Sequence, residues 1–203
     1  DPTSGISSYG SWVHRYDTLS ATEAERLRAS LDRLPSRPLI SVMLSAHGVS
    51  EDKLCHWLDA FTGQLYPDWE LHVVGGASNR SLDACIAKDS RIAKANADSD
   101  AIEQMLMTVR GQYIVFLDTD CLLPAHALFA MADAIARNPG AQVIYSDSDR
   151  LEAGVRSAPY FKPRWNPELL LGHNFLAPFV VYDLHLVRQV GGLRATFDGA
   201  DAY

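Results

Sequence analysis

The sequence predicts an α/β fold with a mostly parallel central sheet flanked by helices. Nearly continuous apolar runs recur along its 203 residues, as they do in strands that are covered on both faces. Amphipathic segments with helix-capping signals separate these runs, and two of the runs end on pairs of acidic residues. Strands and helices that alternate in this way through residue 149 are typical of an open, mostly parallel sheet.

The composition fits a globular protein and disfavours several classes of function. Hydrophobic residues make up 47% of the chain and charged residues 21%, and the net charge of -7 disfavours binding to the phosphates of nucleic acids. No apolar run reaches the roughly 18 residues that a transmembrane helix needs, and nothing near residue 1 resembles a signal peptide. The three scattered cysteines form no CxxC pair, so we expect reduced thiols in a cytoplasmic protein.

The first elements can be placed from caps and periodicity. A helix is expected over 20–34, because Ser20 and Glu23 have capping-box spacing and Pro35 ends the run. Residues 37–46 read as a buried strand. The next helix is capped by Ser50 and carries a stripe of apolar side chains, namely Leu54, Trp57, Leu58, Phe61 and Leu65.

Later segments continue the alternation. The expected elements are a strand at 70–78, helices near 79–89 and 98–109, a strand at 111–120, a helix at 124–137, strands at 141–149 and 177–183, and a helix at 184–192. Pro124 suits the first turn of its helix. The proline-rich segment 157–175 is expected to wind over one end of the sheet.

Two aspartates, Asp118 and Asp120, end the strand at 111–120 directly before a predicted helix. Ligands of such sheets bind outside the carboxyl ends of the strands, and residues i and i+2 of a strand point the same way. If the extension persists, both carboxylates face one small volume, where their repulsion favours a bound cation. Mg²⁺ or Mn²⁺ suits such oxygen ligands. Alternatively, the two residues form only a turn and a helix cap.

Two enzyme classes place an Asp-x-Asp pair at a strand end. In phosphatases of the haloacid dehalogenase type the first aspartate is the nucleophile, but that motif belongs on the opening strand. Here two strand–helix units come first. In nucleotide-sugar transferases the aspartates hold a metal against the diphosphate of the donor.

The flanking residues favour the second class, because the chain resembles the family 2 glycosyltransferases of bacterial polysaccharide synthesis. The resemblance is carried by "RPLISVMLSAHG", "YPDWELHVVGGAS", "GQYIVFLDTDCLLPAHAL" and, most specifically, "VIYSDSDRLEAGVRSAPYFKPRWNPELLLGHNF". It implies the GT-A fold, which is Rossmann-like, over residues 37–203, after an N-terminal helical lead-in over residues 1–36. "GGLRATFDGADAY" is similar to the stretch that leads into the catalytic base, and we expect the family domain to continue beyond it into a longer protein.

The resemblance implies an inverting transfer from a UDP-, dTDP- or GDP-linked sugar to a glycan or lipid-linked acceptor, at the inner face of the membrane. Asp118 and Asp120 would hold Mn²⁺ or Mg²⁺, with Asp120 the direct ligand, and Asp201 would be the base. The nucleotide-sugar site would comprise Ser45, His47, Gly75, Gly76, Asp118 and Asp120. The acceptor side would comprise Asp147, Asp149, Lys162 and Trp165, although Trp165 could instead pack the long loop onto the sheet.

The chain departs from the family pattern at four places. His47-Gly48 replaces a Tyr-Asn pair, Gly75-Gly76 replaces aspartates that bind the nucleotide, and no Asn-Gly-Gly loop precedes the strand at 111–120. Ala202 stands at the position of the base, with Asp201 one place earlier. Two interpretations follow: an active enzyme with altered nucleotide contacts, or a catalytically impaired binding or scaffold domain.

Overall fold

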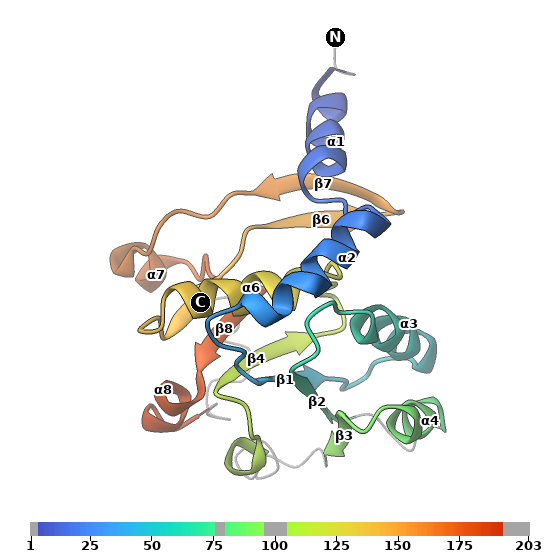
Figure 1. The fold of residues 1–203 in the computed structure, drawn as a ribbon, viewed down its shortest axis with the longest axis vertical. Coiled ribbons are helices and arrows are strands. Elements are labelled where there is room, and N and C mark those ends of the chain that lie inside the picture. Colours follow the sequence, from blue (N-terminus) through green and yellow to red (C-terminus); the bar gives the residue numbers. More distant parts are fainter. Residues whose placement is uncertain (1–3, 76–79, 96–104, 193–203) are drawn as a thin grey trace.

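The computed structural model describes residues 4–75, 80–95 and 105–192. Its centre is a six-stranded sheet of order β3-β2-β1-β4-β8-β5 (Figure 1). The strands are β1 (Ile40–Ser45), β2 (Trp69–Val74), β3 (Ile92–Ala95), β4 (Tyr113–Asp118), β5 (Val143–Tyr145) and β8 (Val180–Asp183). β1 lies parallel to both β2 and β4, and β2 lies parallel to β3, whereas β8 runs antiparallel to β4 and β5. The mostly parallel sheet predicted from the sequence is therefore confirmed.

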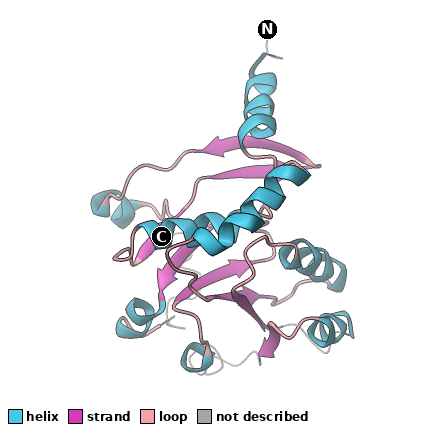
Figure 2. Cartoon of the chain, in the orientation of Figure 1, coloured by secondary structure: helices cyan, strands magenta, loops and turns pink. Residues whose placement is uncertain are grey.

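Helices cover both faces of this sheet (Figure 2). One face packs against α3 (Glu51–Thr62), α4 (Arg80–Lys88) and α6 (Ala127–Arg137). The other face packs against a helical turn at 105–108 and α8 (Leu184–Gln189). The predicted apolar stripe of α3 is buried, as are Leu128, Met131, Ala132 and Ile135 of α6. These side chains lie in the core because the sequence period matches the helix period.

Two helices have boundaries that differ from those expected from the sequence. α6 begins at Ala127, three residues later than expected, because the backbone N–H of Ala127 bonds the carbonyl of Pro124 in a preceding turn. Pro124 therefore lies before the helix and not in its first turn. The helix expected near 98–109 is described only at 105–108, since 96–104 lie outside the described residues.

The N-terminal part contains α1 (Ser4–Tyr16), α2 (Ala21–Ser30) and the short helix η1 (Leu31–Arg33). The capping box of α2 is present: the Ser20 hydroxyl accepts from the backbone N–H of Glu23, and the Glu23 carboxylate accepts from that of Ser20. Leu31 and Leu34 pack against the main core. α1 belongs to the N-terminal helical lead-in that the resemblance implied, although no local pattern marked it as a separate helix. It lies against the β6–β7 hairpin described next (Figure 1).

A two-stranded hairpin follows the main run of strands. β6 (Ser148–Glu152) and β7 (Val155–Tyr160) are antiparallel and are joined at Ala153 and Gly154, which both have positive φ. The expectation that strand 141–149 is continuous and that 157–175 only winds over the sheet was wrong here. The hairpin side chains are mostly exposed, so no apolar alternation marks these strands, and Ala-Gly is a weaker turn signal than Asn-Gly. α7 (Pro167–Gly172) follows.

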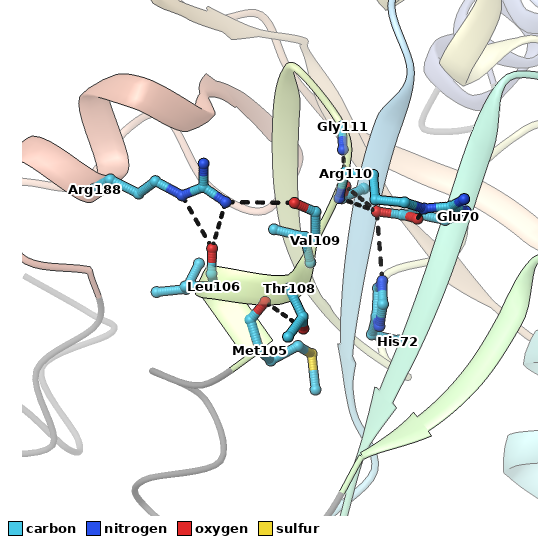
Figure 3. Close-up of polar contacts among 10 residues, drawn as sticks. Glu70, His72, Met105, Leu106, Thr108, Val109, Arg110, Gly111 and Arg188 are labelled. Carbon is cyan, nitrogen blue, oxygen red and sulfur yellow. Dashed lines mark hydrogen bonds and ion pairs between the residues drawn. The ribbon is translucent and has the colours of Figure 1, made fainter.

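A buried carboxylate ties three segments together at the end of the sheet where β2 begins (Figure 3). Glu70 accepts hydrogen bonds from the Ser41 hydroxyl at 2.7 Å, from the backbone N–H of Arg110 at 2.7 Å and from its guanidinium at 2.9 Å. Burial acts to raise the pKa of Glu70, but these donors and the neighbouring His72 outweigh it and lower the pKa to about 2. Gly111 completes the cluster, because a Cβ there would lie 2.4 Å from the Ser41 hydroxyl oxygen.

Arg188 of α8 hydrogen-bonds to the segment that directly precedes Arg110 and Gly111. Its guanidinium donates to the carbonyl oxygens of Leu106 and Val109, at the end of the helical turn at 105–108 (Figure 3). Free carbonyls at a helix end need such partners. Across the described ranges, no helix combines the length and the apolar character needed to cross a membrane.

Candidate functional site

The carboxyl ends of β1, β2 and β4 bring several predicted site residues to one edge of the sheet. Ser45, the last residue of β1, is in register with Val74 of β2 and with Asp118 of β4. Gly75 follows Val74 directly, so Ser45, Gly75 and Asp118 occupy neighbouring positions at this edge. Parallel strands place their carboxyl ends together, and ligands of open α/β sheets bind there.

Asp118 shapes the loop that carries the second aspartate. Its Oδ1 accepts from the backbone N–H of Asp120 at 2.7 Å and from that of Cys121 at 3.1 Å. This Asx turn ends the strand at Asp118, so the extended geometry in which residues 118 and 120 point the same way does not apply. Asp118 therefore forms a turn, which was the simpler of the two alternatives that the sequence left open. In the described part of the chain, no donor bonds its Oδ2.

Asp120 projects from this turn into solvent. Its side chain is 82% exposed, and its Oδ1 lies 2.6 Å from the ammonium of Lys53 on α3. A cation thus already sits beside this carboxylate. An exposed pair of this kind contributes at most about 1 kcal/mol, so a stronger cation can displace the ammonium.

The loop that carries Asp120 is anchored to α3 by a hydrogen bond. The indole N–H of Trp57 on α3 donates to the carbonyl of Cys121 at 2.8 Å. Trp57 is fully buried and stacked on Phe61, so the loop carrying Asp120 is tied to the core of the domain. Burial raises the pKa of the Cys121 thiol to about 12, with Asp118 adding to the shift, so the thiol stays protonated and is no thiolate ligand.

His47 and Gly75, two positions at which the chain departs from the family pattern, are in contact. Gly75 has a φ of +77°, and a Cβ at this position would lie 2.9 Å from three atoms of the His47 imidazole ring. The positive φ disfavours a side chain on the backbone alone. The exposed imidazole therefore covers the place where an acidic side chain would otherwise stand.

The donor atoms at this edge fit a hard divalent metal ion. Protein donors reach Oδ1 of Asp118 and Oδ1 of Asp120, and among the described residues no donor bonds the Oδ2 atom of either carboxylate. Within the described ranges no group of three or more metal-binding side chains gathers. Two carboxylates without further protein ligands match the way Mg²⁺ is held, since that ion completes its shell with substrate phosphates and water.

Asp120 also lines a cavity of about 830 Å³. Its walls come from the loop after β4, α6, the β6–β7 hairpin and α1, which lie next to one another (Figure 1). The volume is that of a small-molecule site. The predicted acceptor-side residues Asp147 and Asp149 both line it, whereas Lys162 and Trp165 do not.

Asp149 belongs to a network of ion pairs that closes one wall of this cavity. Its Oδ2 accepts from the Tyr9 hydroxyl at 2.6 Å and from the Arg156 guanidinium at 2.6 Å. Arg156 also pairs with Asp17 at 2.5 Å, and Asp17 lies 3.0 Å from His126. Burial, together with Asp149, raises the pKa of Tyr9 to about 12, so the phenol stays a donor. The Oδ2 atom of Asp149 is therefore engaged by the protein.

Lys162 is also engaged by the protein. Its ammonium donates to the carbonyl of Leu176 at 2.6 Å, its backbone N–H donates to Asp147, and burial lowers its pKa. Trp165 is 56% exposed, so it does not pack the loop onto the sheet either. Gly76, Asp201 and Ala202 lie outside the described residues, and so do residues 96–104 of the segment that departs from the family before β4.

Sequence reasoning missed several residues at this site: Lys53, Trp12, Phe161 and the other members of the network around Asp149, namely Tyr9, Asp17, His126 and Arg156. Lys53 stands three residues after the cap Ser50, and nothing in the local pattern says that it reaches across to β4. Trp12 lies on α1, for which no helix boundaries were predicted, and Phe161 lies just after β7, where no strand was predicted.

Comparison with known proteins identifies a family match. A model described as Glycosyl transferase family 2 matches residues 41–189, from β1 through α8. The matched range includes Asp118, Asp120 and the β6–β7 hairpin, and it excludes α1 and α2.

Two curated relatives align with 98% of the chain. The O-antigen biosynthesis protein RfbC of Myxococcus xanthus is 35% identical over 209 residues, and the uncharacterized protein y4gI of Sinorhizobium fredii (strain NBRC 101917 / NGR234) is 34% identical over 210 residues. These alignments cover 16% and 23% of the two relatives, so the chain spans less than a quarter of the length of either.

Solved structures share the fold at low sequence identity. The mannosyltransferase PcManGT from Pyrobaculum calidifontis, in complex with GDP-Man and Mn2+, superposes with a TM-score of 0.56 at 17% identity, covering 84% of this chain and 54% of that chain. S. aureus TarS gives a TM-score of 0.56 at 15% identity over 75% of this chain and 29% of that chain. The likeness bears out the GT-A fold.

Proposed function

Because the chain belongs to glycosyl transferase family 2, we propose that it transfers a sugar from a nucleoside-diphosphate sugar to a saccharide or glycolipid acceptor, with inversion. The observation that carries the proposal is the grouping of Ser45, Gly75, Asp118 and the Asp120 loop at one carboxyl edge of the parallel sheet. A diphosphate needs a cation there, and two carboxylates with free oxygens can hold one.

In the proposed donor site, Asp120 binds Mn²⁺ or Mg²⁺ through Oδ2, and Asp118 orients the loop. When bound, the metal would neutralise the negative charge that develops on the leaving diphosphate. Lys53, displaced from Asp120 Oδ1, remains within reach of the same anionic group. The anchor from Trp57 to Cys121 holds the loop in one geometry, which favours catalysis because a preorganised site loses little on binding.

The nucleotide contacts of this chain differ from the family pattern, and we propose that His47 supplies one of them. Its imidazole covers Gly75, stands exposed at the sheet edge and can both donate and accept hydrogen bonds. Gly76 would continue the same wall. We propose Asp201 as the base that removes a proton from the acceptor hydroxyl; its neighbour Ala202 cannot do so.

A second candidate function is a glycosyltransferase-like binding domain without turnover. The Lys53 ammonium on Asp120 favours it, because a chain that carries its own cation at this carboxylate has less need of a metal. The two candidates differ in metal-dependent nucleotide binding, which the first requires.

We therefore expect one of UDP, GDP and dTDP to bind in isothermal titration calorimetry with Mn²⁺ present, at least about 10-fold more tightly than with the metal removed. A phosphate-release assay on p-nitrophenyl phosphate serves as the control for the phosphatase class and should give no activity. Binding of no nucleotide, or binding indifferent to metal, would favour the domain without turnover.

A further inference from the structure

The cavity beside Asp120 is built partly by residues that precede the family match. Residues 41–189 match the family, yet Tyr9, Trp12 and Asp17 of the N-terminal part line the cavity together with the β6–β7 hairpin. The N-terminal helix is thus one wall of the space next to the proposed donor site. A ligand in this space would meet residues that the family match does not include.

Two aromatic rings are in edge-to-face contact in this wall of the cavity. Trp12 of α1 and Phe161, just after β7, have ring centroids 6.0 Å apart in an edge-to-face arrangement. Trp12 is 40% exposed and Phe161 is 59% exposed, and Tyr9 stacks on Trp12 from behind. Partly exposed aromatic rings in a cavity lined by hydrogen-bonding groups suit the apolar faces of sugar rings, since each such ring offers large contact area with little loss of rotamer entropy.

The helix that carries Trp12 is fixed in place by partly buried charges. Arg156 of the hairpin bonds both Asp17, which follows α1, and Asp149, and the Tyr9 hydroxyl bonds Asp149 as well. The side chains of Asp149 and Asp17 are 15% and 21% exposed, so solvent screens these pairs less than it screens surface pairs. Trp12 is therefore presented by a rigid element.

The charge of the cavity restricts the kind of saccharide. Five carboxylates line it against two guanidinium groups. Arg156 is already paired with two of these carboxylates, which leaves an excess of negative charge around the space. An anionic ring such as a uronic acid would be repelled, whereas the hydroxyl groups of a neutral sugar can donate to carboxylates such as Asp147.

We propose that α1 and the β6–β7 hairpin form the acceptor wall of the enzyme, where Trp12 and Phe161 stack on a neutral sugar ring of the acceptor glycan. The inference rests on the proposed function: the ligand of this cavity is the acceptor only if Asp120, which lines the cavity, belongs to the donor site. It assigns the N-terminal helix a role in substrate selection.

The test is a glycan array that carries neutral and uronic-acid-containing oligosaccharides, probed with the full chain. We expect binding to neutral glycans, weakened about 10-fold or more by Trp12→Ala and by Phe161→Ala. Trp12→Phe, which keeps an aromatic ring, should retain most of the binding and thereby separates stacking from simple loss of structure. Tyr160→Ala is the matched control, because Tyr160 is 39% exposed, precedes Phe161 and does not line the cavity.

Three results would overturn the inference: no neutral glycan bound by the wild-type chain, equal losses from Tyr160→Ala and Phe161→Ala, or unchanged binding in Trp12→Ala. Nucleotide titrations of the same variants separate this outcome from failure of the proposed function. Glycan binding that depends on Trp12, in a chain that binds no nucleotide, would keep the saccharide wall and reject the transferase. Nucleotide binding without Trp12-dependent glycan binding would keep the proposed transferase and reject the saccharide wall.

Discussion

Replacing Asp120 with asparagine is expected to weaken Mn²⁺-dependent nucleotide binding by on the order of 100-fold, because an amide oxygen carries no net charge to hold the metal against a diphosphate. The fold should be unaffected. Asp120 is 82% exposed and loses only an exposed pair with Lys53, so the free energy of unfolding should change by less than about 0.5 kcal/mol. Calorimetric titration of the nucleotide measures the first effect, and urea unfolding measures the second.

Two further variants sharpen this prediction. Lys53→Met removes the ammonium that competes for Asp120, so Mn²⁺ should bind a few-fold more tightly than in the wild-type chain. Asp32→Asn is the control for loss of an exposed carboxylate, since the Asp32 side chain is 93% exposed and belongs to η1. Unchanged nucleotide affinity in Asp120→Asn would remove the metal site from the account.

The largest effect on stability is expected from Glu70→Gln, which should lower the free energy of unfolding by about 2–4 kcal/mol at pH 7. The amide oxygen can still accept from the Ser41 hydroxyl and from the backbone N–H of Arg110, but the amide NH2 would then face the Arg110 guanidinium, leaving a buried donor without an acceptor. The expected loss of stability is limited because the Arg110 side chain is 75% exposed, so its guanidinium can be solvated by water once the pair with residue 70 is lost. Glu25→Gln, an exposed change on α2, is the control and should stay within about 0.5 kcal/mol.

The Glu70 contribution also has a defined dependence on pH. A carboxyl group with a folded-state pKa of about 2, below its ordinary value, binds fewer protons in the folded state than in the unfolded state. Its contribution is therefore complete above the ordinary glutamate range and is lost as the pH falls through that range towards 2. Urea unfolding between pH 7 and pH 3 should show the gap between wild type and Glu70→Gln narrowing as acid is added. A gap that widens in acid would contradict the assigned pKa.

The central sheet could be predicted from the sequence because burial on both faces leaves a readable pattern. β1 and β4 are largely apolar, and β2 is apolar apart from Glu70 and His72. Ser50 and the capping box at Ser20 mark the helix starts. The hairpin and α1 left no such pattern, because their outward side chains are exposed and their stability comes from contacts with each other. Those contacts join residues as distant as Tyr9 and Asp149, which local periodicity cannot reveal.

The site was predictable in part for the same reason. The end of a parallel strand marks where ligands bind, so Asp118 and Asp120 could be chosen from the order of the elements. Ser45 followed only from the resemblance to the family. The orientation of the two aspartates could not be predicted, because Asp118 turns its carboxylate onto the following backbone and breaks the two-residue alternation. The roles of Asp201 and of Gly76, which lie outside the described residues, stay predictions.

The most direct test of the account is anomalous diffraction from crystals of the chain grown with Mn²⁺ and the nucleoside diphosphate that binds in the titrations. We predict one anomalous peak within about 2.0–2.2 Å of the Asp120 carboxylate and of a diphosphate oxygen, with the Lys53 ammonium moved off Asp120. A nucleotide bound at the edge formed by Ser45 and Gly75, without metal at Asp120, would contradict the metal role. A Mn²⁺ peak elsewhere, with Lys53 still on Asp120, would contradict the donor site itself.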